Sequence, residues 1–365
     1  MNNPKLNSDI ENLLAKIKRL IEEARQTVVK HVDRTMTITY FLIGRYIVED
    51  EQQGKTRADY SAKTLKTLSQ ALSKEYGKGF SERNLQMMRK FYLIYKNRFE
   101  PVLISQTSST ELNLIADNEL YIISQTVSAK FPELFSLSWS HYQVLCRIDN
   151  VEERNFYEIE SMQNNWSLRE LERQIASSLY ERLVLSRDKH KVKELSEKGQ
   201  IMISPSDAIK DPLILEFLGL KEDISYTETD LESAIIDRLE HFMLEMGKGF
   251  LFAGRQVRIS FEEEHFFIDL VFYNRLLRCF VLIDLKIGKL KHQDIGQMQM
   301  YVNYYDRKVK SEEENNTIGI IICKDKNDAV VEMTLPENNQ QIFASKYLLY
   351  LPTKEELKQL VTHKK

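Results

Sequence analysis

Three ionisable residues within two apolar segments carry the clearest chemical signal in this 365-residue chain. Asp269 interrupts segment 266–273, and Asp284 and Lys286 interrupt segment 279–286. Branched and aromatic residues fill both segments, which predicts two strands. An ionised carboxylate on a mostly buried strand is costly unless something neutralises it, and neighbouring carboxylates also repel each other. A divalent cation between Asp269 and Asp284 would relieve both costs, because hard cations prefer carboxylate oxygens.

Lys286 follows Asp284 by two residues, so the two side chains share one face of their strand. Its ammonium group can steady a metal-bound water or neutralise charge that develops on a phosphoryl group. A bound metal ion polarises a phosphoryl oxygen and lowers the pKa of its water. Two acids and a lysine at one end of a sheet therefore predict a phosphodiesterase that uses Mg²⁺ or Mn²⁺.

Residues on flanking elements are further candidates for this site. Glu232, early in a predicted helix, can add a metal ligand or hold a metal-bound water; the alternative is an exposed acid favoured by the helix dipole. Gln297 and Tyr301 lie four residues apart on a later helix, so both point the same way. They can orient the lysine or contact a phosphate, or else serve packing and the surface. Arg255, on a predicted strand, is a candidate contact for a nucleic-acid backbone.

The second half of the chain alternates helix and strand. A helix is predicted over 230–246, and three strands over 250–259, 266–273 and 279–286. A helix over 293–305, a buried strand over 317–323 and a short strand over 347–351 follow. This order predicts an α/β domain with a central mixed sheet.

Residues 8 to about 180 have apolar side chains at helical spacing, which predicts an all-α region. The turn at Gly77 to Gly79 and the helix that follows resemble a helix-turn-helix DNA reader. In that interpretation Arg83, Asn84 and Arg89 contact phosphates or base edges. A solvated helix face is the alternative. The predicted organisation is an α+β chain: a helical domain over 1–185, a polar linker over 186–212 and the α/β domain over 213–365.

Composition sets limits on the class of protein. A net charge of −3 gives no support to a dedicated nucleic-acid binder, although 51 basic residues can still cluster locally. Three cysteines without paired spacing argue against a disulfide framework or a Cys-rich zinc site, and favour a cytoplasmic setting. No apolar run reaches the roughly 20 residues of a membrane-spanning helix.

The motifs resemble those of a known family. The order Glu232, Asp269, Asp284-Leu285-Lys286 and Gln297-x-x-x-Tyr301, on helix, strand, strand and helix, is similar to the PDDEXK nuclease superfamily. Within it, segments 267–273, 277–279 and 296–301 resemble the YhcG-like proteins, which join a helical domain of uncharacterised role to a PDDEXK domain. In the N-terminal half the resemblance rests on segments 79–85, 88–92 and 166–171. It extends over nearly the whole chain.

The resemblance implies a restriction-endonuclease-like fold and Mg²⁺-dependent cleavage of DNA phosphodiesters. Asp269 and Asp284 would be ligands, and Lys286 would take the catalytic position. Two positions depart from the superfamily pattern: Ile268 stands where a proline is expected, and Asp284 replaces the commoner glutamate. Because aspartate reaches less far than glutamate, the metal geometry would differ slightly.

Two other functions remain open at the level of sequence. The chain can be a binding module for DNA or protein that keeps a nuclease fold but not its chemistry. It can also be a subunit of a restriction or recombination assembly that is active only with partners. A homodimer is a further expectation by analogy, since cutting two DNA strands needs two sites.

Overall fold

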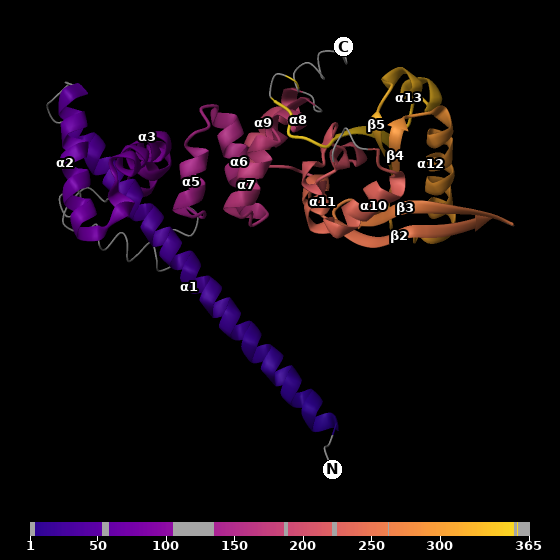
Figure 1. The fold of residues 1–365 in the computed structure, drawn as a ribbon, viewed down its shortest axis with the longest axis horizontal. Helices are drawn as coiled ribbons and strands as arrows, with labels where there is room; N and C mark the ends of the chain where they lie inside the picture. Colours follow the sequence, from indigo (N-terminus) through magenta and orange to yellow (C-terminus); the bar gives the residue numbers. More distant parts are fainter. Residues whose placement is uncertain are drawn as a thin grey trace. The chain divides into compact units, whose positions relative to one another are not determined.

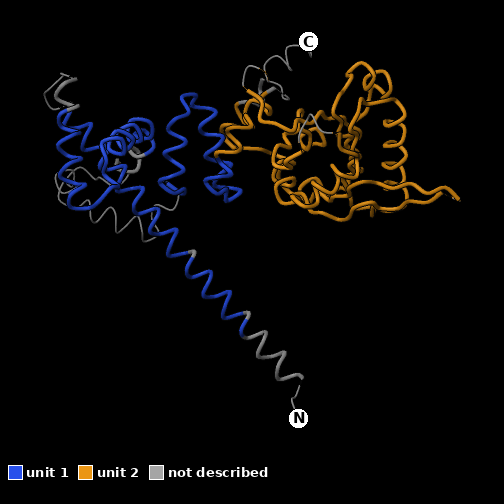
Figure 2. The backbone as a smooth tube through the Cα atoms, viewed as in Figure 1, with its two compact units in different colours: residues 1–171 blue, residues 172–365 orange. Residues whose placement is uncertain are grey.

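The computed structural model describes residues 4–52, 58–104, 135–185, 189–220, 225–261, 263–353 and 356. The chain divides into two compact units, residues 1–171 and 172–365 (Figure 2). Unit 1 is helical and unit 2 contains all the described strands, as the sequence predicts. Within the described residues, no helix is long and apolar enough to cross a membrane. Residues 106–110 form a polar run that indicates irregular structure, and they lie outside these ranges.

Unit 1 is built on a long helix, α1, whose C-terminal part packs on α3 (Figure 1). Its helices are α1 (Pro4–Gln52), α2 (Ala58–Tyr76), α3 (Glu82–Ile104), α5 (Trp139–Leu145) and α6 (Val151–Gln163), and α7 (Leu168–Ala176) spans the division between the units. Phe41, Phe91, Phe135 and Tyr142 form its aromatic centre, with ring centroids 4.9–5.5 Å apart in contacting pairs. Gly44 lets α1 approach the backbone of α3, because a Cβ there would overlap Met88.

Unit 2 is a six-stranded mixed sheet in the order β1-β6-β5-β4-β3-β2. The strands are β1 (Leu213–Ile214), β2 (Phe250–Phe261), β3 (Glu264–Asn274), β4 (Cys279–Lys289), β5 (Ile318–Asp325) and β6 (Ile342–Leu348). The helices are α8 (Leu179–Leu185), α9 (Lys189–Lys198), α10 (Glu228–Asp237), α11 (Leu239–Met246), α12 (His292–Tyr304) and α13 (Asp328–Thr334). β2, β3 and β4 are antiparallel neighbours, whereas β4, β5, β6 and β1 pair in parallel.

Each face of the sheet has its own core. Ile283 and Leu285 of β4 pack with apolar residues of α10 and α11. Leu282, which alternates with them, packs with Met298 and Val302 of α12 on the other face. Alternation along β4 therefore assigns Asp284 and Lys286 to the face that carries α12.

The helix predicted over 230–246 is in fact two helices, because the helical conformation is interrupted at Arg238. Leu231, Ile235 and Phe242 are buried in one core. An unbroken helix would put Arg238 on the same buried face, seven residues after Leu231. The break leaves Arg238 exposed and lets both halves bury their apolar residues. The last strand was also predicted too late in the chain, since β6 occupies 342–348.

A buried ion cluster fastens α8 to the α/β core of unit 2. Arg182 Nη1 lies 2.5 Å from Glu245 Oε1 of α11, and both side chains are almost fully buried. Arg173 Nη2 lies 3.6 Å from the other oxygen of Glu245. Burial opposes ionisation of Glu245, but Arg182, Lys210 and Arg173 outweigh it and lower its pKa to about 2.

The boundaries at residues 185 and 212 remain a prediction about which segments fold independently.

Candidate nuclease site

β3 and β4 separate at the point where the site begins. Their pairing runs from Asn274 opposite Cys279 to Leu270 opposite Ile283, and stops there. Beyond this point the Asp269 side chain takes the place of the backbone ladder, because its Oδ2 accepts a hydrogen bond of 2.7 Å from the Leu285 amide. Asp269 is thereby held beside the residue that follows Asp284.

Asp284 is the buried member of the pair, with 2% of its surface exposed. Burial raises the pKa of its carboxyl to about 6; Lys286 opposes this shift, and Asp269 and Asp294 reinforce it. Its Oδ2 lies 2.8 Å from Lys286 Nζ but makes no aligned hydrogen bond. A buried carboxylate oxygen in this situation still lacks a full complement of positive partners.

Lys286 lies between two acids. Its ammonium contacts Asp284 and lies 3.9 Å from Glu228 Oε2, at the start of α10. Burial lowers the pKa of Lys286, but the Asp284 carboxylate more than offsets this effect, so its pKa lies above the usual value. The lysine is therefore a stable cation at neutral pH, suited to stabilising anionic oxygens and unsuited to acting as a base.

Gln256 joins Glu232 to Asp269. Its Nε2 lies 2.5 Å from Glu232 Oε2 and 3.0 Å from Asp269 Oδ1. Glu232 is buried on α10, whereas Gln256 is exposed on β2. The backbone of Gln256 has φ +46°, a left-handed conformation that costs on the order of 1 kcal/mol for a residue other than glycine. Its neighbours Arg255 and Val257 pair with β3, but the ladder skips Gln256 itself.

Arg255 also contacts Glu232, with its Nε 3.6 Å from Glu232 Oε1, and about half of its side chain is exposed. The predicted backbone-binding arginine is therefore at the site, at its solvent-facing side. Asp284 is buried, whereas Arg255 and Gln256 are exposed, so the side of the site that carries Arg255 faces solvent.

Gln297 and Tyr301 connect α12 to β3. Gln297 Nε2 donates to the Tyr301 hydroxyl at 2.5 Å, and that hydroxyl donates to the Phe267 carbonyl at 3.0 Å. Burial and the Asp284 charge raise the pKa of Tyr301 to about 12. The pair thus fixes the backbone two residues before Asp269. Gly319 of β5 lets α12 pack closely on the sheet, because a Cβ there would lie 2.5 Å from Met298 Sδ.

In the described part of the chain, no three acidic, histidine or cysteine side chains already gather as a metal-ligand cluster. Asp269 and Asp284 lie close enough for one to raise the pKa of the other. Glu232 is joined to Asp269 through Gln256. The donor set nevertheless suits a hard cation, because it consists of carboxylate oxygens, those of Asp284 being buried.

The structure also places the residues of the predicted DNA-reading helix. Arg83 is exposed on the first turn of α3. Asn84 donates to the Gly79 carbonyl at 3.1 Å, and Arg89 Nε lies 2.7 Å from Glu51 of α1. Asn84 and Arg89, two of the three candidates, therefore already interact with other residues of unit 1.

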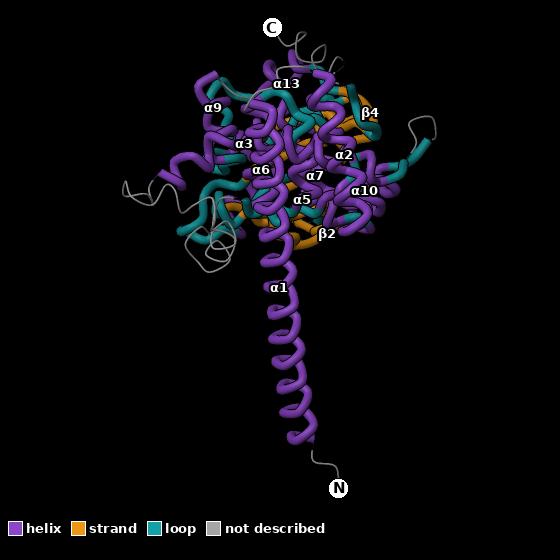
Figure 3. The backbone as a smooth tube through the Cα atoms, turned by 90° about the vertical axis from the view of Figure 1, so that its left-hand side faces the viewer, coloured by secondary structure: helices purple, strands orange, loops and turns teal. Residues whose placement is uncertain are grey.

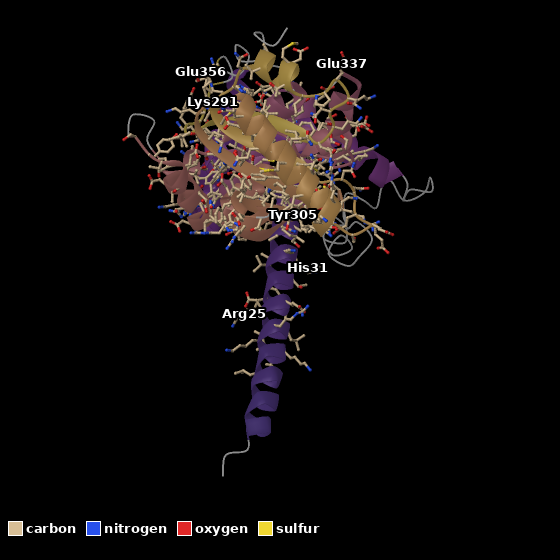
Figure 4. All side chains as sticks on the ribbon, turned by 90° about the vertical axis from the view of Figure 1, so that its right-hand side faces the viewer. Arg25, His31, Lys291, Tyr305, Glu337 and Glu356 are labelled. Atoms are coloured by element: carbon tan, nitrogen blue, oxygen red, sulfur yellow. The ribbon has the colours of Figure 1, made fainter. Side chains whose placement is uncertain are left out.

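Sequence reasoning missed two features of this site. Gln256 is an unremarkable residue type, and only the strand register places it opposite Asp269. Lys289 and Lys291 are exposed directly beyond Lys286, and Lys291 is labelled just before α12 in Figure 4. The signal for these lysines was available: a run of basic residues immediately follows the Asp284-x-Lys286 motif.

Comparisons with known proteins identify two family domains in this chain. Residues 206–362 match the YhcG PDDEXK nuclease domain, and residues 16–182 match the DUF1016 N-terminal domain. The chain is 41% identical over 351 residues to the Escherichia coli (strain K12) protein named "Putative nuclease YhcG", an alignment that spans 93% of this chain and 90% of that protein. The chain belongs to the YhcG family. Its membership confirms the family resemblance and the nuclease fold predicted for the second half.

Two solved structures match part of this YhcG-family chain. A repair endonuclease from Pyrococcus abyssi is 18% identical, with 36% of this chain and 50% of that chain aligned and a TM-score of 0.24. A structure titled "Structure of EndoMS-dsDNA2 complex" is 15% identical over 37% of this chain and 50% of that chain, with a TM-score of 0.25. Each alignment spans half of the solved chain, and scores this low carry no argument about function.

Proposed function

We propose that this YhcG-family nuclease hydrolyses DNA phosphodiester bonds with Mg²⁺ or Mn²⁺. The observation that carries the proposal is the convergence of Asp269, Asp284 and Lys286 where β3 and β4 separate. Asp269 and Asp284 would hold the metal ion, and Glu232 would add a ligand once Gln256 releases it. When bound, the ion would polarise a phosphoryl oxygen and activate a water molecule.

The chain's own groups have separate tasks in this proposal. Lys286 stabilises negative charge on the phosphoryl oxygens, which the high pKa of its ammonium supports. Gln297 and Tyr301 act through the backbone of β3 and keep Asp269 in register with Leu285. Arg255 contacts the phosphate backbone from the solvent-facing side. In unit 1, Arg83 is the best placed of the three candidate DNA contacts, because Asn84 and Arg89 hold other groups.

We further infer a setting for this activity. Three free, buried cysteines are consistent with a reducing, cytoplasmic compartment. A nuclease with this layout fits DNA repair, recombination or restriction, alone or within a larger assembly. The binding-module alternative is disfavoured by the complete set of Asp269, Asp284 and Lys286, since a site without chemistry has no need for a buried, poorly neutralised acid.

The direct test is cleavage of linear, nicked, branched and single-stranded DNA. We expect cleavage of at least one form with Mg²⁺ or Mn²⁺ and none in EDTA. Asp284→Ala, purified in the same way, is the control for contaminating nucleases. DNA binding that is indifferent to metal, without cleavage of any form, would favour the binding module instead.

Lys289 and Lys291 provide a second test, of the DNA-binding side. The double change Lys289→Gln/Lys291→Gln removes two exposed positive charges beside the site. We expect weaker binding of every DNA sequence and a salt dependence, in log–log form, that is shallower by about 2. Fluorescence anisotropy with a labelled duplex between 50 and 200 mM salt, roughly the range in which such contacts are sensitive, measures both quantities.

The matched control is Lys193→Gln/Lys198→Gln on α9, where both lysines are exposed and paired to glutamates within one helix. This control has the same change in net charge. An equal loss of affinity in both double variants would mean that overall charge, and not a surface beside the site, governs DNA binding.

A further inference from the structure

The N-terminal part of α1 has an apolar stripe that is uncovered in the described structure. We define the seam as Leu14, Ile17, Ile21, Ala24 and Val28. These positions are spaced alternately by three and four residues, the heptad spacing of a coiled coil. All five are exposed, the four larger ones to between 45% and 60%.

The same stripe is buried further along the helix. After the polar His31 and Thr35, Ile38 and Leu42 return to the same heptad register, and both are almost fully buried in unit 1, where α1 packs on α3. Figure 3 shows α1 as one uninterrupted helix, and in Figure 4 Arg25 and His31 mark the stretch that extends beyond the other helices of unit 1. The stripe therefore has one covered and one uncovered half.

An uncovered half of this composition needs a partner. Ile17, Ile21 and Val28 are β-branched, and such residues have low intrinsic helix propensity. Helices in proteins gain most of their stability from packing an amphipathic face against another element. Burial of the seam would supply that contribution.

We propose that the seam pairs with the same seam of a second copy of this chain, as a parallel coiled coil. In this register Leu14, Ile21 and Val28 occupy the a positions, and Ile17 and Ala24 occupy the d positions. The β-branched Ile21 and Val28 at a are compatible with two parallel strands. The two copies would present identical surfaces, which is the requirement of a closed two-fold dimer.

The charges beside the seam select the parallel orientation. Lys18 and Arg25 flank one edge, and Leu20 and Thr27 flank the other. An antiparallel pair would bring like edges together and oppose the cations of the two copies. A parallel pair puts Arg25 of one copy beside the uncharged edge of the other, so its aliphatic stem can cover Leu20.

The polar face of the same stretch argues against a membrane as the occupant. Glu22, Glu23 and Asp33 lie there together with basic residues, and Arg19 Nε pairs with Glu23 Oε1 at 2.7 Å. Helices that lie on anionic membranes carry mainly lysine and arginine on that face. A mixed, internally paired face suits exposure to solvent around a dimer.

Sedimentation equilibrium of the full chain at micromolar concentration tests the proposal. We expect the parent to be a dimer, and Ile21→Lys/Val28→Lys to associate roughly 100-fold more weakly or more, because charges would replace two central apolar layers. The control Arg19→Gln/Glu23→Gln changes the opposite face and should remain dimeric. A monomeric parent, or a double-lysine variant that is still dimeric, would overturn the proposal.

Cysteine cross-linking tests the orientation. The chain's own three cysteines are buried, so an introduced surface cysteine dominates the oxidation reaction. Ile17→Cys should form a disulfide-linked dimer, because a parallel pair places position 17 of each copy within the roughly 7 Å between Cα atoms that a disulfide tolerates. Arg19→Cys, on the opposite face, should not. Equal cross-linking of both, or of neither, would contradict a parallel seam. Neither experiment depends on nuclease activity.

Discussion

Asp284→Asn should give a protein that is more stable than the parent at neutral pH and at least about 10³-fold slower in DNA cleavage. The slower cleavage follows from the loss of the buried carboxylate at the centre of the site. The added stability follows from its burial, which raises the pKa of Asp284 to about 6. An amide of the same shape removes that unfavourable charge.

The pH dependence gives the prediction a definite sign. The pKa of Asp284 in the folded chain is higher than its value of about 3.9 in an unfolded chain. The folded state therefore binds the proton more tightly, and the free energy of unfolding falls as the pH rises from about 4 to about 6. Above that range the parent should be less stable than Asp284→Asn by roughly 1–2 kcal/mol, since loss of the Lys286 contact offsets part of the gain.

Urea unfolding in EDTA at several pH values between 4 and 8 measures this effect. The control is Asp237→Asn, an exposed residue at the end of α10, which should alter neither stability nor cleavage. If Asp284→Asn were less stable than the parent at pH 7.5, the Asp284 carboxylate would stabilise the fold through its ion pair with Lys286. It would then not be a buried charge that destabilises the metal-free protein. Cleavage at the parental rate would remove Asp284 from the site.

The placement of Asp269, Asp284 and Lys286 was predictable from sequence because it depends on local rules. Alternation along a strand places Asp284 and Lys286 on one face, and two neighbouring apolar strands bring Asp269 beside them. The helix with Gln297 and Tyr301 follows from apolar spacing alone. The structure adds what these residues contact: Gln297 donates to the Tyr301 hydroxyl, which donates to the Phe267 carbonyl.

The position of Gln256 and the break at Arg238 depend on long-range strand register and on local backbone conformation. Gln256 lies opposite Asp269 only when β2 and β3 pair as observed. Its positive φ cannot be predicted from its residue type, because glutamine has no preference for that conformation. The break at Arg238 was foreseeable in principle, since an arginine falls where the helical stripe needs an apolar residue. Intrinsic helix propensity favours one continuous helix over 230–246. Two helices form because only then are the apolar residues of both halves buried.

Gln256 offers the second large effect, because it stands between two carboxylates. Its amide donates to both Glu232 and Asp269, at 2.5 and 3.0 Å. Hydrogen bonds to charged groups contribute about 1.5–3 kcal/mol each. Gln256→Glu removes both bonds and adds a third negative charge, so we expect it to lower the free energy of unfolding by about 3 kcal/mol or more in EDTA.

Metal ions should reverse that loss. Three acids together form a stronger site for a hard cation than two acids bridged by an amide. A ligand that binds only the folded state stabilises it by about 2.7 kcal/mol at a concentration of 100 times its Kd. The rise in Tm on adding Mn²⁺ should therefore be larger for Gln256→Glu than for the parent, a result that thermal unfolding records without any measurement of cleavage.

Gln256→Met separates the two contributions to this effect. Methionine has a similar length but neither donates a hydrogen bond nor carries a charge, so this variant loses the bridge without adding repulsion. Its stability in EDTA should fall between those of the parent and Gln256→Glu, and its response to Mn²⁺ should also exceed that of the parent, because no amide would compete for Glu232 and Asp269. If all three proteins respond equally to Mn²⁺, the ion does not bind between these carboxylates, and the metal site consists of Asp269 and Asp284 without Glu232.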